Sequence, residues 1–294
     1  MTTLVGAGYR PELRAIFADG TAAVAELVLD RYGSARGAYR RPWDLAQVVG
    51  RIPVLLHGLS GNVGSVVGPR AGYVELVGER ARSLGAIAYS DHLAMTRTAT
   101  HGLGHLAPNL YDQMLLARAT GHVERLAEAL DPVGCPLVLE NLAYDRRLSG
   151  SQWTAEEFTL RLLDATAKWS LLLDVTNLWV NSTNFAFDAL AFLDALPPER
   201  IALVHMAGPQ RFDDWWVDTH GAAVRDETFA LLEDVLARPG VEPIAIVVER
   251  DTNFQGAEPE VRADLARVRS TLEGTAARRG AAQPRPTRSA SLPA

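Results

Sequence analysis

Eight short apolar runs, spaced along nearly the whole chain, constrain the fold of this sequence more than any other feature. Each run holds three to five residues and nearly all lack polar alternation; they occupy residues 4–7, 25–29, 53–56, 86–89, 136–139, 171–173, 201–204 and 244–248. Continuous apolar strands are typical of a parallel sheet that helices cover on both faces. The runs therefore predict buried parallel strands.

Amphipathic segments fill most of the intervals between these runs. We expect helices over residues 72–84, 111–130, 188–195, 227–237 and 258–272, and a further helix that begins at Thr154, where Glu157 completes a capping box. Strand–helix alternation indicates βα units with right-handed crossovers. Eight such units match the α/β TIM barrel, (β/α)8, and a doubly wound open sheet is the alternative.

The expected domain organisation is simple. Residues 1–274 are interpreted as a single TIM-barrel catalytic domain, and residues 33–38 as a flexible loop within it. The tail at 275–294 is rich in Ala, Arg and Pro, has little apolar surface to bury, and is expected to be disordered.

Charge and cysteine content exclude several classes of protein. The net charge of −6 argues against nucleic-acid binding, which needs a basic surface. The single cysteine, Cys135, excludes a disulfide within the chain and a Cys-rich zinc site. The N-terminal residues show no signal peptide and the chain has no apolar stretch of about 18 residues, so we expect no membrane association and a cytoplasmic location.

Acidic residues and histidines follow six consecutive apolar runs. In a TIM barrel these strand ends face one mouth, where barrel enzymes carry their active sites. Asp218 and His220, in the loop after the seventh run, are expected to lean over the same mouth. The residues that end the six runs are His57, His92, Glu140, Asp174, His205 and Glu249, the last followed by Asp251.

Such a cluster is best explained by bound metal. Carboxylates crowded in one cavity repel one another, and cations relieve the repulsion more fully than histidines do. Imidazole and carboxylate without thiolate suit iron, manganese, zinc or cobalt. Eight ligands exceed what one ion needs, so we infer two or three metals and at least one bridging carboxylate. A hydrogen-bonded core histidine or a helix cap explains one such residue, but not six in register.

Other residues carry weaker signals. His105 lies in a Gly-rich loop and either contacts substrate or is a solvated loop residue. His122 is interpreted as a surface residue of a helix, and Cys135 as a structural residue at a strand start. Trp215 and Trp216 either line a substrate groove or pack the loop in which they lie.

At these residues the sequence resembles the multinuclear non-heme iron-dependent oxidative enzymes (MNIO, formerly domain of unknown function 692), the family of the methanobactin-biosynthesis oxidase. The resemblance runs from about residue 5 to residue 254. It is carried by the ordered series Gly6-Ala7-Gly8-Tyr9-Arg10-Pro11-Glu12, Leu56-His57-Gly58, Ser90-Asp91-His92-Leu93, Leu139-Glu140-Asn141, Leu173-Asp174-Val175-Thr176-Asn177, His205-Met206-Ala207-Gly208, Asp218-Thr219-His220 and Glu249-Arg250-Asp251-Thr252.

The resemblance implies a xylose-isomerase-like TIM barrel with two or three iron ions in mixed ferrous and ferric states. It implies a dioxygen-dependent oxidase that modifies a residue, often cysteine, of a ribosomal precursor peptide, with a separate leader-recognition partner protein. The implied catalytic residues are Glu140, Asp174 and His205. The implied ligands are His57, His92 and Glu140 for one iron, Glu140, Asp174, His205 and Glu249 for a second, and Asp218 and His220 for a third, with Asn177, Asp251 and His105 as further third-metal or substrate contacts.

Two stretches depart from the family pattern, and two other functions stay open. Residues 27–32 replace the family's aromatic–Glu–Val stretch and the Glu-Asn that follows it, and Thr176 stands where the family has Asn. One alternative is a hydrolase or isomerase with zinc, manganese or magnesium that acts on a sugar or on abasic DNA. The other is a barrel that binds metal only for stability or assembly.

Overall fold

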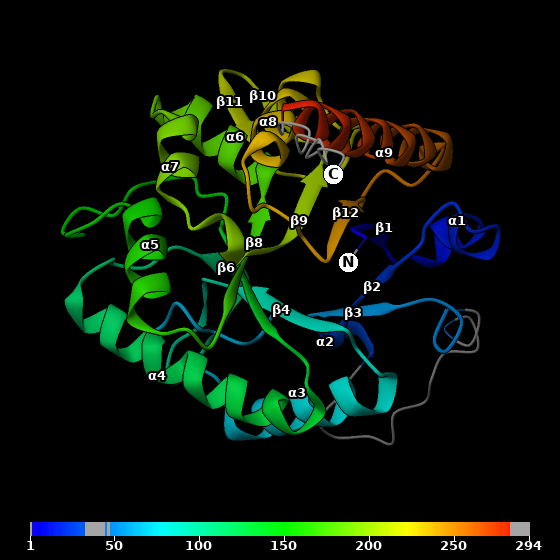
Figure 1. Ribbon diagram of the computed structural model, residues 1–294. Coiled ribbons are helices and arrows are strands. Elements are labelled where there is room, and N and C mark those ends of the chain that lie inside the picture. Colours follow the sequence, from blue (N-terminus) through cyan, green and yellow to red (C-terminus); the bar gives the residue numbers. More distant parts are fainter. Residues whose placement is uncertain (1, 33–44, 46–47, 283–294) are drawn as a thin grey trace, which may run out of the picture.

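The computed structural model describes residues 2–32, 45 and 48–282, and its centre is a closed barrel of eight parallel strands (Figure 1). The order around the barrel follows the chain, and β12 pairs with β1 to close it. This confirms the TIM barrel over an open sheet, and every predicted strand is present. The strands are β1 (Leu4–Gly8), β2 (Ala25–Val28), β3 (Val54–His57), β4 (Ala88–His92), β7 (Leu137–Glu140), β8 (Ser170–Asp174), β9 (Ile201–Ala207) and β12 (Ala245–Glu249).

Helices surround the barrel on the outside (Figure 1). The predicted capping box is present, because Thr154 Oγ1 accepts from Glu157 N at 3.1 Å and Glu157 Oε2 accepts from Thr154 N at 2.9 Å. The helices are α1 (Arg14–Ala18), α2 (Leu29–Tyr32), α3 (Ala71–Leu84), α4 (Gln113–Leu130), α5 (Ala155–Ala165), α6 (Val175–Phe185), α7 (Ala189–Ala195), α8 (Asp226–Ala237) and α9 (Ala257–Ala282), with 3-10 turns η1 (Pro11–Leu13), η3 (Asp131–Val133) and η4 (Pro198–Arg200).

Two β-hairpins extend the loops at the C-terminal end of the barrel. The first, β5 (Met95–Arg97) with β6 (Gly102–Ala107), follows β4. The second, β10 (Gln210–Phe212) with β11 (Trp215–Val217), follows β9. Because both hairpins follow strand ends that carry predicted site residues, they flank the barrel mouth.

The barrel has two separate apolar layers. The larger one lies between the strands and the helices. The smaller one fills the barrel interior and is called the inner plug here; it comprises Val24, Leu55, Ala88, Val138, Leu172, Leu203, Ala245 and Val247. Side chains alternate across a strand, so residues two positions after the plug also point inward. The plug therefore forms the floor beneath whatever the barrel mouth holds.

Two expectations about the chain need correction. Residues 275–282 are not a disordered tail, because they continue α9, and the Thr275 side chain is buried and donates to Thr271 O at 2.8 Å. Residues 283–294 and the predicted loop at 33–38 lie outside the described residues. In the described part of the chain, no helix has the length and apolar character that a membrane crossing needs.

Candidate metal centre

A layer of polar side chains lies directly above the inner plug. Seven strands each contribute one residue to it, and in each case the residue follows a plug residue by two positions. We call this the polar layer; its members are Glu26, His57, Ser90, Glu140, Asp174, His205 and Glu249, all at most 5% exposed. The fold thus buries four carboxylates and two imidazoles in one plane of the barrel, with the His92 imidazole above them at the end of β4.

Three groups of these and adjoining residues have the spacing of metal sites. Within each group, one ligand atom per residue lies within 4.8 Å of the others. Glu140 is shared by the first two groups, and Glu249 by the second and third. The groups are His57, His92 and Glu140; Glu140, Asp174, His205 and Glu249; and His220, Glu249 and Asp251.

In the first group, two imidazoles present the same nitrogen to Glu140. His57 Nε2 and His92 Nε2 lie 3.8 and 3.3 Å from Glu140 Oε2. Their other nitrogens face neutral acceptors: His57 Nδ1 is 2.8 Å from Ser90 Oγ, and His92 Nδ1 is 3.2 Å from Gly58 O. These contacts favour the Nδ1–H tautomers and leave both Nε2 lone pairs free for a ligand.

In the second group, His205 has the opposite orientation. Its Nδ1 lies 3.0 Å from Glu249 Oε2 and 3.7 Å from Glu140 Oε2. Asp174 ends β8 and also caps α6, since its Oδ1 accepts from Asn177 N at 2.6 Å. The cap fixes one carboxylate oxygen and leaves the other, Oδ2, directed into the barrel without a partner.

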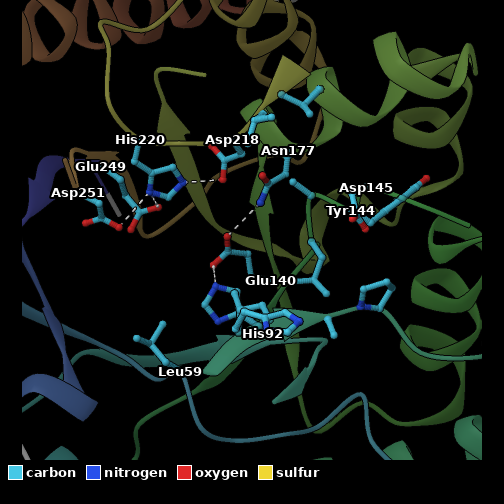
Figure 2. Close-up of a pocket in the computed structure, with 18 of the residues that line it drawn as sticks. Leu59, His92, Glu140, Tyr144, Asp145, Asn177, Asp218, His220, Glu249 and Asp251 are labelled. Carbon is cyan, nitrogen blue, oxygen red and sulfur yellow. Dashed lines mark hydrogen bonds and ion pairs between the residues drawn. The ribbon is translucent and has the colours of Figure 1, made fainter. Parts of the chain in front are cut away.

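The third group surrounds His220 at the mouth (Figure 2). His220 Nε2 lies 2.7 Å from Asp218 Oδ2, whereas its Nδ1 lies 3.3 Å from Asp251 Oδ2 and 3.7 Å from Glu249 Oε2. Asp251 also pairs with the buried Arg10. The backbone of His220 has φ of 49°, a strained value for a non-glycine residue, and such strain is concentrated at functional sites.

Burial shifts the pKa values of these groups in opposite directions. Burial, with the added charge of Asp218, raises the pKa of Asp174 to about 8, and burial raises that of Glu140 well above its usual range. Burial lowers the pKa of His92 to about 4 and that of His57 well below its usual value. The two histidines are therefore neutral at pH 7 and able to donate a lone pair.

His205 and Glu249 behave as an ion pair. Burial alone favours neutral imidazole, but Glu249 and Glu26 outweigh it and hold the pKa of His205 well above its usual value. Burial likewise acts to raise the pKa of Glu249, but His205 and His220 hold it well below its usual range. In the metal-free protein, the imidazolium of His205 thus compensates part of the carboxylate charge that a cation would otherwise balance.

The residues present fit a bound metal on two independent grounds. The donor set is imidazole and carboxylate, which suits iron, manganese, zinc or cobalt. Several buried polar atoms also lack any hydrogen-bond partner, which is costly unless something else satisfies them. At this centre these atoms are Glu140 Oε2, Asp174 Oδ2, Asn177 Oδ1 and Asp218 Oδ1.

Two asparagines fix the ligand-bearing strand ends. Asn141 joins β7 to β8, because its side chain donates to Asp174 O at 3.0 Å and accepts from Asp174 N at 2.9 Å. Asn177 donates to Asn141 O at 3.0 Å and lies 3.4 Å from Glu140 Oε1 (Figure 2). Glu140 and Asp174 are therefore held at adjacent strand ends by paired amide contacts.

The centre opens into a cavity of about 800 Å³. His105 and the pair Trp215 and Trp216 line it, although the His105 side chain is exposed and belongs to none of the three groups. A second cavity, of about 660 Å³, shares Leu59, His105 and Leu106 with the first. A third, of about 260 Å³, shares Pro108, Tyr144, Arg146 and Leu148. We call these three adjoining cavities the groove.

The structure brings together all eight residues expected to bind metal, and Asp251, expected as a further third-metal or substrate contact, lies beside them. Sequence reasoning missed Glu26, although a lone carboxylate inside an apolar run was a signal. His122 was interpreted wrongly as a surface residue: it is buried, and its Nδ1 lies 3.2 Å from Val63 O. Cys135 is buried, and burial raises the pKa of its thiol to about 12, as a structural role requires.

Comparison with solved structures shows the fold. The chain is similar to L-ribulose 3-epimerase (TM-score 0.60, 16% identity, 97% of this chain and 100% of that one). It is also similar to mannonate dehydratase from Streptococcus suis (TM-score 0.64, 10% identity, 100% and 99%) and to a xylose isomerase domain protein from Planctomyces limnophilus (0.58, 13%, 95% and 99%). At these identities the likeness establishes a xylose-isomerase-like TIM barrel and nothing about the reaction.

Comparison of sequences shows the family. The chain is 33% identical over 262 residues to a UPF0276 protein of Shewanella amazonensis, covering 86% of this chain and 89% of the relative. It is 34% identical over 282 residues to a UPF0276 protein of Streptomyces avermitilis, covering 91% and 55%. The family described as "RiPP precursor modification enzyme MbnB/TglH/ChrH" matches residues 4–273, and the chain therefore belongs to that family of peptide-modifying enzymes.

Proposed function

We propose that this protein is a multinuclear iron enzyme that uses dioxygen to oxidise a residue, cysteine foremost, of a ribosomal precursor peptide. The family supports a precursor peptide as the substrate. The observation that carries the metal part is the shared carboxylate Glu140, which belongs to two groups of ligand spacing at once. A carboxylate between two donor sets is what a bridged pair of ions requires.

The proposed ligands follow from the three groups. His57, His92 and Glu140 would hold one ion, and Glu140 with Asp174, His205 and Glu249 a second. A third would lie at His220, where Asp218 with Asn177 and Asp251 with Glu249 offer donors on opposite sides of the ring. When bound, iron would supply the one-electron chemistry with dioxygen that no side chain here provides.

The chain's own groups have distinct parts in this proposal. Neutral His57 and His92 leave coordination positions toward the cavity, because both line it, whereas Asp174 and His205 are fully buried beneath it. Asn177 lies within reach of Glu140 Oε1 and orients the shared carboxylate. The two hairpins restrict water at the mouth.

The groove supports an extended substrate. The central cavity alone would accommodate a small molecule. The two adjoining cavities share lining residues with it and extend it beyond the centre, as a substrate longer than the modified residue requires. All described elements belong to the barrel, its helices or the two hairpins, so we assign leader recognition to a separate partner protein.

The test combines metal analysis with turnover. We expect protein purified without oxygen to carry at least two irons per chain and a mixed-valent signal in electron paramagnetic resonance. With the small peptide encoded beside its gene, it should consume dioxygen and change the peptide mass only when dioxygen is present.

Two outcomes would contradict the proposal. Zinc or manganese as the native metal, with turnover of a sugar that needs no dioxygen, would favour the hydrolase or isomerase alternative. A metal with no exchangeable position and no peptide turnover would favour a purely structural role. Both are distinguishable from failed reconstitution, because iron content and signal are measured before any substrate is added.

A further inference from the structure

Among the described residues, Glu26 is the one carboxylate of the polar layer that contacts a proposed ligand at the nitrogen facing away from the other ligands. It lies on β2, is 1% exposed, and belongs to none of the three groups. Its Oε2 is 2.9 Å from His205 Nε2, and the His205 side chain is itself fully buried. The two residues are 179 positions apart in the sequence, so the contact exists only because the barrel closes.

The contact determines which nitrogen of His205 carries a proton. A carboxylate beside Nε2 accepts a hydrogen bond from Nε2–H and so keeps the proton on that nitrogen, which leaves the Nδ1 lone pair for the group formed with Glu140 and Glu249. His57 and His92 have neutral partners instead, Ser90 Oγ and Gly58 O, and present Nε2. Within the described residues, His205 is thus the one imidazole of the first two groups whose outward-facing nitrogen, the one directed away from Glu140, contacts a carboxylate.

We propose that Glu26 is a positioning residue: by accepting the Nε2–H of His205, its carboxylate directs Nδ1 to the metal and makes that nitrogen a stronger donor. The inference rests on the proposed metal centre. Carboxylate–histidine–metal arrangements fix the tautomer and ring orientation of the ligand and raise its basicity. Loss of such a partner typically lowers metal affinity about 10–100-fold.

A purely structural role is the competing explanation. A buried carboxylate is costly, and Glu26 Oε1 has no hydrogen-bond partner. If Glu26 served only packing, an apolar residue of similar size would serve as well or better. The two explanations therefore differ in metal affinity and in the protonated nitrogen of His205, and not in whether the variant folds.

The experiment uses zinc, which is diamagnetic, and the full-length protein. Zinc affinity is measured by competition with a chelator, and the protonated nitrogen of His205 by 15N–1H long-range correlation in the zinc-loaded protein. Glu26→Gln keeps an acceptor for Nε2–H but removes the charge, whereas Glu26→Leu removes both. Ser90→Ala removes the neutral partner of His57, and Asp264→Asn removes a buried carboxylate elsewhere on the barrel.

We expect wild-type His205 to carry its proton on Nε2 and to bind zinc through Nδ1. Zinc affinity should fall about 10-fold in Glu26→Gln, which keeps an acceptor for Nε2–H, and about 100-fold in Glu26→Leu, where Nε2–H has no acceptor. Asp264→Asn should match the wild type, and Ser90→Ala should lose less than Glu26→Leu.

Wild-type affinity in Glu26→Leu, or a wild-type His205 that binds zinc through Nε2, would overturn the inference and leave the proposed function intact. A wild-type protein that binds neither zinc nor iron would overturn both. Thermal unfolding of each variant without metal shows that it is folded before its affinity is interpreted.

Discussion

The Glu140 side chain both destabilises the metal-free fold and serves the proposed function. It is 2% exposed, burial and neighbouring carboxylates raise its pKa well above the usual range, and its Oε2 has no hydrogen-bond partner. Such a residue destabilises a metal-free fold, because a buried carboxyl without its partner is costly. Its proposed role is to be a ligand common to two groups of metal-binding residues.

Glu140→Gln should therefore separate the two effects. We expect bound metal to fall by at least one ion per chain and turnover to be abolished, because an amide is a poor bridge between cations. The metal-free variant should be more stable than the metal-free wild type, by about 1–2 kcal/mol, since a buried carboxyl is replaced by a neutral isostere. Elemental analysis and chemical denaturation measure the two effects. Wild-type metal content in the variant would contradict the role of Glu140.

The metal ligands were predictable from the sequence because they lie at the ends of apolar runs, whereas Glu26 was missed because it lies within one. Five of the six predicted strand-end residues immediately follow an apolar run, and His92 lies three positions after one, so the change in polarity is plain at each. Glu26 lies inside its run, because the apolar residues of that run continue through residues 27–29, beyond the position that reaches the polar layer. The rule that finds it is spacing: Val24 and Glu26 are two apart, like Leu55 and His57.

At the scale of elements, strands were easier to predict than the helices next to them. Helix α6 was not predicted, because residues 175–185 are rich in Val, Thr and Asn, which are weak helix formers. Its helical state depends on its setting: Asp174 caps it, and its buried face packs onto β9 and α8. Helix α5, by contrast, carries its own start signal in the Thr154 capping box, which the structure confirms.

Thr154→Ala tests that start signal. It removes the acceptor for Glu157 N, a contact at 3.1 Å on the outside of the barrel. We expect a loss of about 1 kcal/mol in the free energy of unfolding, or about 2–4 °C in Tm. Metal content should be unchanged, because Thr154 belongs to none of the metal groups. An unchanged Tm, measured by circular dichroism, would mean that the cap contributes nothing here.

Helix α9 offers a test of pH dependence away from the metal centre. Asp264 is 7% exposed, its Oδ2 accepts from Val224 N at 3.1 Å, and burial raises its pKa to about 6. An unfolded Asp has a pKa near 3.9, so between about pH 4 and 6 the folded protein binds the proton more tightly than the unfolded chain. The contribution of this group to stability is thus complete below about pH 4 and is lost as the pH rises to about 6.

Asp264→Asn should remove this dependence, because the amide oxygen still accepts from Val224 N and carries no charge. Relative to the variant, we expect the wild type to lose about 1–2 kcal/mol between pH 4.5 and 7.5. Urea denaturation of both proteins in the same metal state measures the difference. A stability difference that does not change with pH would show that Asp264 does not titrate in this range.

At the scale of the whole molecule, closure of the barrel both assembles the candidate metal centre and buries its charged side chains, which lowers the stability of the metal-free protein. Closure was predictable from eight apolar runs, but the partners that it creates were not: Arg10 meets Asp251, and Glu26 meets His205, only across the closed barrel. Sequence patterns report the local environment of a residue, whereas these pairs depend on the register between strands. The alternatives left open by the sequence therefore concerned chemistry more than fold.

The same closure predicts how metal should change global stability. A folded barrel holds the ligands together, an unfolded chain does not, and a ligand that binds only the folded state stabilises it by about 2.7 kcal/mol at 100 times its Kd. Added zinc or ferrous iron should thus raise the Tm of chelator-treated wild type by about 5 °C or more. Thr154→Ala should begin at a lower Tm and show the same rise, because its defect lies outside the centre.

Glu140→Gln should begin at a higher Tm and show a much smaller rise, which makes the two variants opposite controls for one measurement. If metal raised the Tm of Glu140→Gln as much as that of the wild type, the stabilising ion would be bound elsewhere on the surface. If metal raised the Tm of neither the wild type nor Glu140→Gln, the unpartnered buried carboxylates of the barrel would need another explanation. The rise in Tm thus measures how strongly the buried polar layer is coupled to the stability of the whole barrel, because barrel closure brings the ligand groups of the described residues together.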